Sequence, residues 1–337
     1  MSKAVVYGLR PDEVPLLQKE LEELQRKGHE LEIVTTPEYL TKDNTSLAEG
    51  ADAVLIVAAC KITEEVAEGL HRAGVKYILT RSTGFDQISK EAIQKYGIRA
   101  ANVPVYSTNA VPEFTVLLML ALVRKWKPME KKLAHQDFTL GGVQGKELGS
   151  MTLGLFGTGK LGIKTAEILH AMGCTILASS PHEKEEAKPY VTYTTQEEVF
   201  RKSDLLFFHC VLNDATKKMV NRETIAKMKD GVYLVNTARG GLVDFEAVLD
   251  GLKSGKIAGF ASDVYDKEAQ FIRMDLTGKE IEDPVLRELL SRDDVILTPH
   301  VAFFTETSVS NLIRLSLESL IEFEETGHCE REVYRTE

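Results

Sequence analysis

The feature that most constrains the fold is the stretch TLGLFGTGKLGIKTAEIL at residues 152–169. Its core, GTGKLG, has the glycine spacing of a dinucleotide-binding turn, with a strand-like run before it and a helical pattern after it. Gly157 permits the tight turn, Gly159 lets the backbone approach a pyrophosphate, and Gly162 allows the helix to pack close to the strand. This context favours a nucleotide-binding βα unit over a glycine-rich turn that binds no ligand.

About 150 residues precede this turn, although such a turn usually opens its domain. These residues alternate apolar runs (KAVVYG, LEIVT, AVLIVA, YILTRS and a weaker IRAANV) with helical patterns. In the first helical pattern, Val14, Leu17, Leu21 and Leu24 recur at three or four residues, and Gly28 ends it. Alternation of this kind predicts a parallel sheet covered on both faces, so one α/β unit is complete before the turn begins.

After the turn, the strand-like runs CTILASS, LLFFHC, VYLVNT, IAGFASDV and DVILTPH predict a second doubly wound unit. The chain then closes with an amphipathic helical pattern at residues 305–327, which has no strand of its own to pair with. We expect this helix to cross back and pack on the N-terminal unit. The fingerprint then lies in mid-chain because the nucleotide-binding domain is inserted into the other domain.

Composition limits the partners of the chain. Its 337 residues carry a net charge of −10 with no basic face, which argues against nucleic acid. A strongly apolar helix expected at residues 111–126 is too short to cross a bilayer and suits packing or a subunit contact. With no signal region at the N-terminus, we expect a cytoplasmic protein that does not enter a membrane. The four cysteines, scattered singly, favour reduced thiols over a metal or redox site: Cys60, Cys174, Cys210 and Cys329.

The strand after the turn bears on the choice of coenzyme. Such a strand usually ends in an acid that binds the adenosine ribose, but here Ser179 and Ser180 stand at that position in ILASSPHEK. Without a carboxylate nothing repels a 2′-phosphate, and these hydroxyls with His182 could bind one. Three glutamates in the same loop argue the other way. Both NAD(H) and NADP(H) stay open, and the local chemistry slightly favours NADP(H).

Three later segments each place ionisable residues after a predicted strand: Arg239 in VNTARGG, Asp263 and Glu268 in ASDVYDKE, and His300 in LTPH. Ligands of open α/β sheets lie outside these strand ends. Arg239 can hold a carboxylate in bidentate fashion, and His300 can give a proton to a carbonyl oxygen. Glu268 can orient the imidazole and keep it protonated. Each residue alone is more often structural, but together with the turn they predict redox chemistry on a 2-oxo acid.

These motifs together resemble the D-2-hydroxyacid dehydrogenases, and within them the D-lactate dehydrogenase branch. The match runs through VKYILTRSTGFDQIS, NVPVYSTNA, GTGKLG, VNTARGGLVD, DVYDKE and TPHVAFFTET in the family's order. The resemblance implies a flavodoxin-like substrate domain from residues 1–102 and 301–337, with a Rossmann domain, residues 103–300, inserted into it. It also implies a cleft between the domains and a homodimer, for which the apolar helix after Asn109 would supply a contact.

The resemblance assigns roles to individual residues. Arg239, Glu268 and His300 become the catalytic set, with His300 the proton donor in reduction. We expect no metal site. Positions expected to line the cofactor are Tyr106, Gly157, Gly159, Lys160, Leu161, Gly162, Ser180, Cys210, Val211, Thr216, Thr237, Ala238 and Asp263.

The substrate side follows in the same way. The amides of Thr83 and Gly84 would help to hold the substrate carboxylate, while Val57 and Phe303 would line the pocket for its side chain. Val57 is small and apolar, and only Lys61 is near to pair with a second carboxylate. We therefore expect a 2-oxo or 2-hydroxy acid with an apolar side chain: pyruvate or a larger aliphatic or aromatic acid.

Two departures from the family pattern leave alternatives open. Ser180 stands where NAD-dependent members carry an acid, and Val211 stands where the usual His-Val-Pro run has proline, so that loop could sit differently against the cofactor. A non-catalytic, corepressor-like NAD(P) sensor could keep the same catalytic residues, although a chain little longer than two domains argues against it. A methyltransferase would leave Arg239, Glu268 and His300 without roles.

Overall fold

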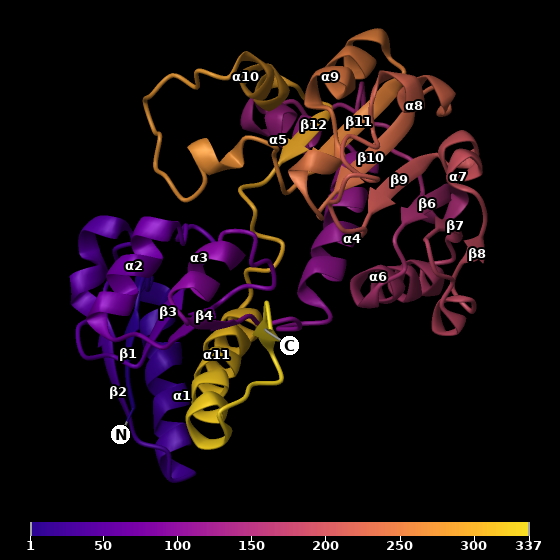
Figure 1. Cartoon of the computed structure of the whole chain (residues 1–337). Coiled ribbons are helices and arrows are strands. Elements are labelled where there is room, and N and C mark those ends of the chain that lie inside the picture. Colours follow the sequence, from indigo (N-terminus) through magenta and orange to yellow (C-terminus); the bar gives the residue numbers. More distant parts are fainter. Residues whose placement is uncertain (1, 336–337) are drawn as a thin grey trace. The chain divides into compact units, whose positions relative to one another are not determined.

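The structure, a computed structural model, describes residues 2–335 and divides into two compact units (Figure 1). Unit 1 holds the chain up to Ser107 and again from Phe304 onward, and unit 2 runs from Thr108 to Phe303. The chain thus passes between units at 107/108 and 303/304, slightly beyond the predicted 102/103 and 300/301. The first boundary lies later because the segment after β5 (Arg99–Ala101) stays bonded to unit 1, where Asn311 Nδ2 donates to the carbonyl of Tyr106 at 2.8 Å.

The sheet of unit 1 has the strand order β13-β5-β4-β3-β1-β2. Its strands are β1 (Ser2–Val6), β2 (Leu31–Thr35), β3 (Ala53–Ile56), β4 (Tyr77–Thr80), β5 (Arg99–Ala101) and β13 (Glu332–Val333). The five parallel strands follow the order 2-1-3-4-5 of flavodoxin-like sheets, which confirms the predicted fold. The antiparallel β13 is a strand of two residues, too short to leave an apolar pattern in the sequence.

The helices of unit 1 are α1 (Val14–Arg26), α2 (Glu64–Ala73), α3 (Lys90–Lys95) and α11 (Glu306–Thr326). The prediction that the last helix returns to the N-terminal unit is confirmed, since α11 packs beside α1 and β4 (Figure 1). Its buried face includes Ile313, Leu317 and Leu320, which join one of the two apolar cores that cover this sheet.

The sheet of unit 2 is parallel throughout, in the order β12-β11-β10-β9-β6-β7-β8. Its strands are β6 (Thr152–Phe156), β7 (Thr175–Ser179), β8 (Thr192–Tyr193), β9 (Leu205–Phe208), β10 (Val232–Asn236), β11 (Ile257–Ser262) and β12 (Val295–Leu297). From β8 to β11 this is the 3-2-1-4-5-6 order of a Rossmann sheet, with β12 added as a seventh strand. Strand order reverses between β6 and β9, the place where such sheets bind nucleotides. The two-residue β8 was not predicted.

The helices of unit 2 are α4 (Ala110–Val123), α5 (Trp126–Ala134), α6 (Lys160–Ala171), α7 (Gln196–Lys202), α8 (Arg222–Lys227), α9 (Phe245–Ser254) and α10 (Pro284–Ser291). The strongly apolar α4 packs on α6, β10 and β11, and Met119 and Val123 are fully buried there. Packing inside unit 2 therefore accounts for most of its apolar character, while Leu117 stays exposed. Within residues 2–335, no helix combines the length and apolar character needed to cross a membrane.

Candidate functional site

Glycine is suited to the three positions of the turn between β6 and α6 for different physical reasons. Gly157 has a φ of +95°, and a Cβ there would lie 2.7 Å from the backbone nitrogen of Cys210. A Cβ on Gly162 would lie 2.1 Å from the carbonyl oxygen of Gly157. Gly159 differs, because nothing lies within 4 Å of the position of its Cβ. Two glycines therefore allow close packing, and the third leaves open space at the start of the helix.

The N-terminus of α6 is built to receive an anion. Gly159 is its N-cap residue and offers no side chain to the first amides, whereas Thr195 caps α7, Asp244 caps α9 and Thr305 caps α11. The uncapped amides and the positive end of the helix dipole are suited to a phosphate group. Lys160 begins the helix beside this opening. The turn thus fits the pyrophosphate of a dinucleotide.

The loop after β7 carries no acid at the ribose-binding position. Ser179 and Ser180 are half-buried there. The loop is tied to the glycine turn by Tyr193, whose hydroxyl donates to Thr158 Oγ1 at 2.8 Å and accepts from the amide of Lys184 at 2.9 Å. Because Tyr193 lies on the unpredicted β8, sequence reasoning missed this connection.

The segment after β9 lies against the turn and then opens to solvent. His209 is half-buried, its Nε2 is hydrogen-bonded to Thr165 Oγ1 at 2.9 Å, and desolvation lowers its pKa to about 4. Burial also raises the pKa of the half-buried Cys210 thiol to about 11. Val211, in place of the family's proline, is 71% exposed. The hydroxyl of Thr216 donates to the carbonyl of Val211 at 2.6 Å and thereby closes this loop.

The turn after β10 is held by Asn236. Its Oδ1 accepts from the amide of Ala238 at 3.0 Å, and its Nδ2 donates to the carbonyl of Arg239 at 2.9 Å. The hydroxyls of Thr237 and Thr115 are hydrogen-bonded at 2.7 Å, which joins this turn to α4. The Arg239 side chain is exposed, and its Nη1 donates to the carbonyl of Ala238 at 2.8 Å. The turn therefore presents the guanidinium outward at the carboxyl edge of the sheet.

The next glycine brings this turn against the segment that carries Glu268. A Cβ on Gly240 would lie 2.3 Å from the backbone carbon of Tyr265, so only glycine permits the approach. The amide of Tyr265 in turn donates to Glu268 Oε2 at 3.0 Å. Packing of backbone on backbone thus places Arg239 close enough to lower the pKa of Glu268 by its charge.

Glu268 and His300 form a hydrogen-bonded pair. Nδ1 of His300 donates to Oε1 of Glu268 at 2.8 Å, and the two side chains are 33% and 26% exposed. Burial alone would raise the pKa of Glu268, but the hydrogen bond and charge of His300 outweigh it, and the pKa is lowered. Since Nδ1 is engaged, Nε2 is the nitrogen that can exchange a proton with a ligand.

Asp263 holds the backbone around His300. Oδ1 accepts from Thr298 Oγ1 at 2.5 Å and from the amide of Val301 at 2.8 Å, while Oδ2 accepts from the amide of Ala302 at 2.8 Å. Burial raises the pKa of Asp263, although these hydrogen bonds oppose the shift. Both oxygens therefore bind the chain itself, and the predicted contact with the cofactor stays a prediction.

The predicted substrate residues Val57, Thr83 and Gly84 follow strands of unit 1. Val57 comes directly after β3, while Thr83 and Gly84 lie in the turn after β4, where Asn102 Nδ2 donates to the carbonyl of Thr83 at 2.7 Å. Within residues 2–335, the amides of Thr83 and Gly84 make no hydrogen bond, so both can donate to a ligand. Sequence reasoning missed Tyr39, whose ring meets the same position as Val57 over Gly8: a Cβ on Gly8 would lie 2.8 Å from Tyr39 and 3.1 Å from Val57.

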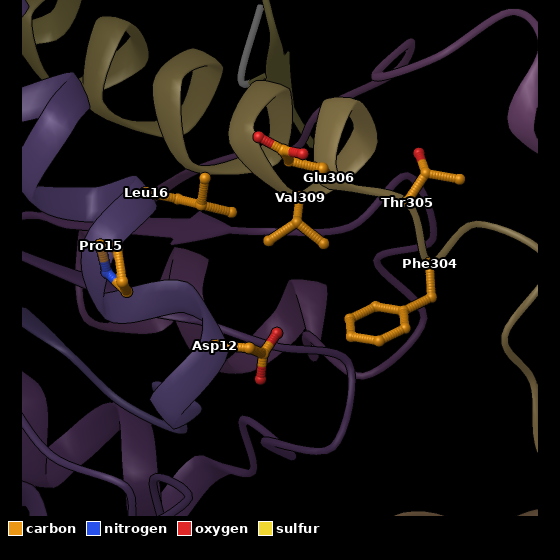
Figure 2. A pocket seen from close by; sticks show the side chains of 7 residues that line it. All are labelled: Asp12, Pro15, Leu16, Phe304, Thr305, Glu306 and Val309. Atoms are coloured by element: carbon orange, nitrogen blue, oxygen red, sulfur yellow. The ribbon is translucent and has the colours of Figure 1, made fainter.

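A hollow of about 270 Å³ in unit 1 lies between the starts of α1 and α11 (Figure 2). Its lining comprises Asp12, Pro15, Leu16, Phe304, Thr305, Glu306 and Val309. Its two acids are Asp12 and Glu306, and the Asp12 carboxylate is paired with Arg10, whose Nε donates to Oδ1 at 3.2 Å. The lining of the hollow includes none of the residues predicted to bind the substrate. In the described part of the chain, no cluster of three His, Cys, Asp or Glu could hold a metal ion.

Known proteins share this architecture. Residues 116–302, more than half of the chain, match the family model of the D-isomer specific 2-hydroxyacid dehydrogenase NAD-binding domain. An aromatic 2-oxoacid reductase of Clostridium sporogenes is 38% identical over 331 residues, which cover 98% of each chain. A D-lactate dehydrogenase of Lactiplantibacillus plantarum is 36% identical, with 98% of this chain and 99% of that one covered. The crystal structure of a D-lactate dehydrogenase from Treponema pallidum superimposes with a TM-score of 0.89 at 33% identity, over 98% of this chain and 99% of that one.

Proposed function

Because the chain belongs to the D-isomer specific 2-hydroxyacid dehydrogenases, with an NAD-binding domain at residues 116–302, we propose that it reduces 2-oxo acids to D-2-hydroxy acids. The observation that carries the proposal is the His300–Glu268 pair at 2.8 Å, in the same unit as an uncapped glycine turn. The pair supplies a proton donor, and the turn supplies a place for the coenzyme. A sensor protein needs the second of these but not the first.

The residues divide the reaction between them. When bound, NAD(H) supplies the hydride that is added to the carbonyl carbon. Nε2 of His300 donates a proton to the carbonyl oxygen, and Glu268 keeps the ring oriented through its hydrogen bond to Nδ1. Arg239 is proposed to bind the substrate carboxylate in bidentate fashion. In unit 1, the amides of Thr83 and Gly84 are proposed as donors to the substrate.

The substrate side chain is proposed to be apolar. Val57 and Phe303 would line its pocket, and the ring of Tyr39 beside Val57 adds an aromatic surface on the same edge of the sheet. Lys61, the cation closest to Val57 in the sequence, is exposed, which argues against a built site for a second acidic group. The aromatic 2-oxoacid reductase among the relatives supports an aromatic 2-oxo acid as substrate, and the D-lactate dehydrogenase supports pyruvate.

The coenzyme proposal is NAD(H), with NADP(H) as the competing form. Ser180 and the absence of an acid at the end of β7 would tolerate a 2′-phosphate, and the exposed His182 lies in the same loop. The relative rates with the two reduced coenzymes decide between them.

A homodimer is proposed to form through unit 2. Exposed apolar side chains gather along one stretch of that unit: Leu117, Trp126, Leu133, Phe138 and Leu140. A second copy of the chain is the occupant that we propose for this surface, because burying several large apolar groups stabilises association. The homodimer and a cytoplasmic location stay predictions.

The test is a set of initial rates with NADH and, separately, NADPH, against pyruvate, 2-oxoisocaproate, phenylpyruvate and 2-oxoglutarate. We expect rapid oxidation of a reduced coenzyme with at least one of the apolar acids. A preference for 2-oxoglutarate would refute the apolar pocket. Binding of both coenzymes without turnover on any acid would refute the enzyme and support a corepressor-like NAD(P)-sensing protein.

A further inference from the structure

The segment between β11 and α10 carries Glu268 and, five residues later, Arg273. Glu268 begins a short 3-10 turn, and its carbonyl accepts from the amides of Phe271 at 3.0 Å and Ile272 at 2.8 Å. These turns set the separation of the two side chains along the segment. A single short stretch of chain therefore presents both a carboxylate and a guanidinium to the loop that follows β12.

The guanidinium of Arg273 contacts three groups of that loop. Nη2 donates to the carbonyl of His300 at 3.1 Å, and Nη1 donates to the carbonyl of Pro299 at 3.4 Å. The same group lies over the ring of Phe303, with Cζ 5.5 Å from the ring centroid. A planar fork with several donors can make all three contacts at once, and a cation over an aromatic face is attracted to it.

The backbone that Arg273 binds has an unusual conformation. His300 has a φ of +56°, which non-glycine residues adopt only where surrounding contacts enforce it. Asp263 binds the amides of Val301 and Ala302, on the C-terminal side of His300. Arg273 binds the carbonyls of Pro299 and His300. The peptide groups on both sides of the imidazole are therefore tied down, by one acid and one base.

We propose that Arg273 is a positioning residue of the reaction. It fixes the backbone of His300, so that the imidazole can meet Glu268 on one side and the substrate carbonyl on the other. It also fixes the ring of Phe303, the residue proposed to face the substrate side chain. Because one guanidinium touches both, the geometry of the proton donor is coupled to the wall of the side-chain pocket. This inference rests on the proposed function.

The coupling makes a specific expectation. Loss of the guanidinium frees the His300 backbone with every substrate, so kcat should fall for small and large acids alike. It also frees Phe303, which contacts only a substrate with a large side chain, so KM should rise for phenylpyruvate more than for pyruvate. If Arg273 only stabilised a surface loop, its loss would lower the Tm without a larger rise in KM for phenylpyruvate than for pyruvate.

The experiment compares Arg273→Ala and Arg273→Lys with Lys279→Ala, an exposed cation of the same segment, as the matched control. For each full-length variant, kcat and KM are measured with pyruvate and phenylpyruvate, together with the Kd for reduced coenzyme and the Tm. We expect Arg273→Ala to lower kcat by about 10-fold, part of the roughly 10²-fold that a 1 Å misplacement of reacting groups can cost, because Asp263 still holds the amides after His300. Arg273→Lys should recover part of that loss, and Lys279→Ala should match the wild type.

The inference is overturned if Arg273→Ala keeps the kcat of the wild type on both acids, or if Lys279→Ala loses as much activity. A fall in Tm with unchanged kinetics would also overturn it. Wild-type turnover tests the proposed function separately. If the wild type reduced none of the acids, the proposed function and the positioning role of Arg273 would both be refuted. Normal wild-type turnover with unaffected Arg273 variants would remove only the positioning role.

Discussion

Each of the two sheets carries an arginine and a glutamate beside the carboxyl ends of its strands, but one pair is buried and the other is accessible to solvent. In unit 1, Arg81 follows β4, and its Nη1 donates to Glu13 Oε1 at 2.7 Å, with side chains 1% and 5% exposed. In unit 2, Arg239 follows β10 with an exposed side chain, and Glu268 is only partly covered. The two sets have the same residue types and differ in how far solvent reaches their side chains.

The difference shows what each arginine is for. Nη2 of Arg81 donates to the carbonyls of Tyr7 at 2.9 Å and Gly8 at 3.2 Å, so the guanidinium binds the loop after β1. Burial lowers the pKa of Arg81, although the charge of Glu13 opposes the shift. Arg239 bonds to its neighbour Ala238 and presents its other donors to solvent. A sealed arginine stabilises the fold, and an open one can bind a substrate.

The sharpest way to test this division is to remove the proton donor. His300→Gln should lower kcat by about 10²–10⁴-fold, the usual contribution of general acid catalysis. The Kd for reduced coenzyme and the Tm should stay close to those of the wild type, because the imidazole is partly exposed and contacts Glu268. Steady-state rates and coenzyme fluorescence titration measure both. If turnover survives, the proton comes from another group and the open cluster is not catalytic.

The second test concerns the buried pair, and here we expect the stability of the fold to change. Arg81→Met leaves the buried Glu13 carboxylate without its main partner, so the free energy of unfolding should fall by about 3–5 kcal/mol. Arg10 remains near Glu13, with Nη2 3.4 Å from Oε1, which favours the lower end of that range. Urea unfolding measures the change.

The control for this variant is the double substitution Arg81→Met/Glu13→Leu. Replacing a buried ion pair by apolar groups is often neutral, so the double variant should recover most of the lost stability. If Arg81→Met unfolds at the urea concentration of the wild type, the sealed pair does not stabilise unit 1. The inference that the buried arginine stabilises the fold would then be wrong.

The sequence predicted the two units better than it predicted the surroundings of individual residues. The apolar strands, the glycine spacing and the helix at residues 305–327 follow from periodicity, because buried elements must repeat with the structure. The two-residue strands β8 and β13 are too short to show a period, and with β8 the sequence missed the tie from Tyr193 to the turn. The sequence also does not distinguish RSTG from ARGG: each places an arginine after a strand, and only the packed structure shows that Arg81 is sealed. Arg273 was missed because it binds backbone carbonyls, which carry no residue signal.

The smallest effect is expected at the open arginine itself. Arg239→Lys keeps the positive charge but cannot reproduce the bidentate fork, so one charge-assisted hydrogen bond to the substrate carboxylate is lost. Such a bond contributes about 1.5–3 kcal/mol, which corresponds to a fall in kcat/KM of about 10–100-fold. The change should appear mainly in the KM for the 2-oxo acid, with the Kd for reduced coenzyme and the urea midpoint unchanged. A loss of stability comparable to that of Arg81→Met would mean that Arg239, although exposed, is structural, whereas an unchanged KM and rate would remove Arg239 from the substrate site.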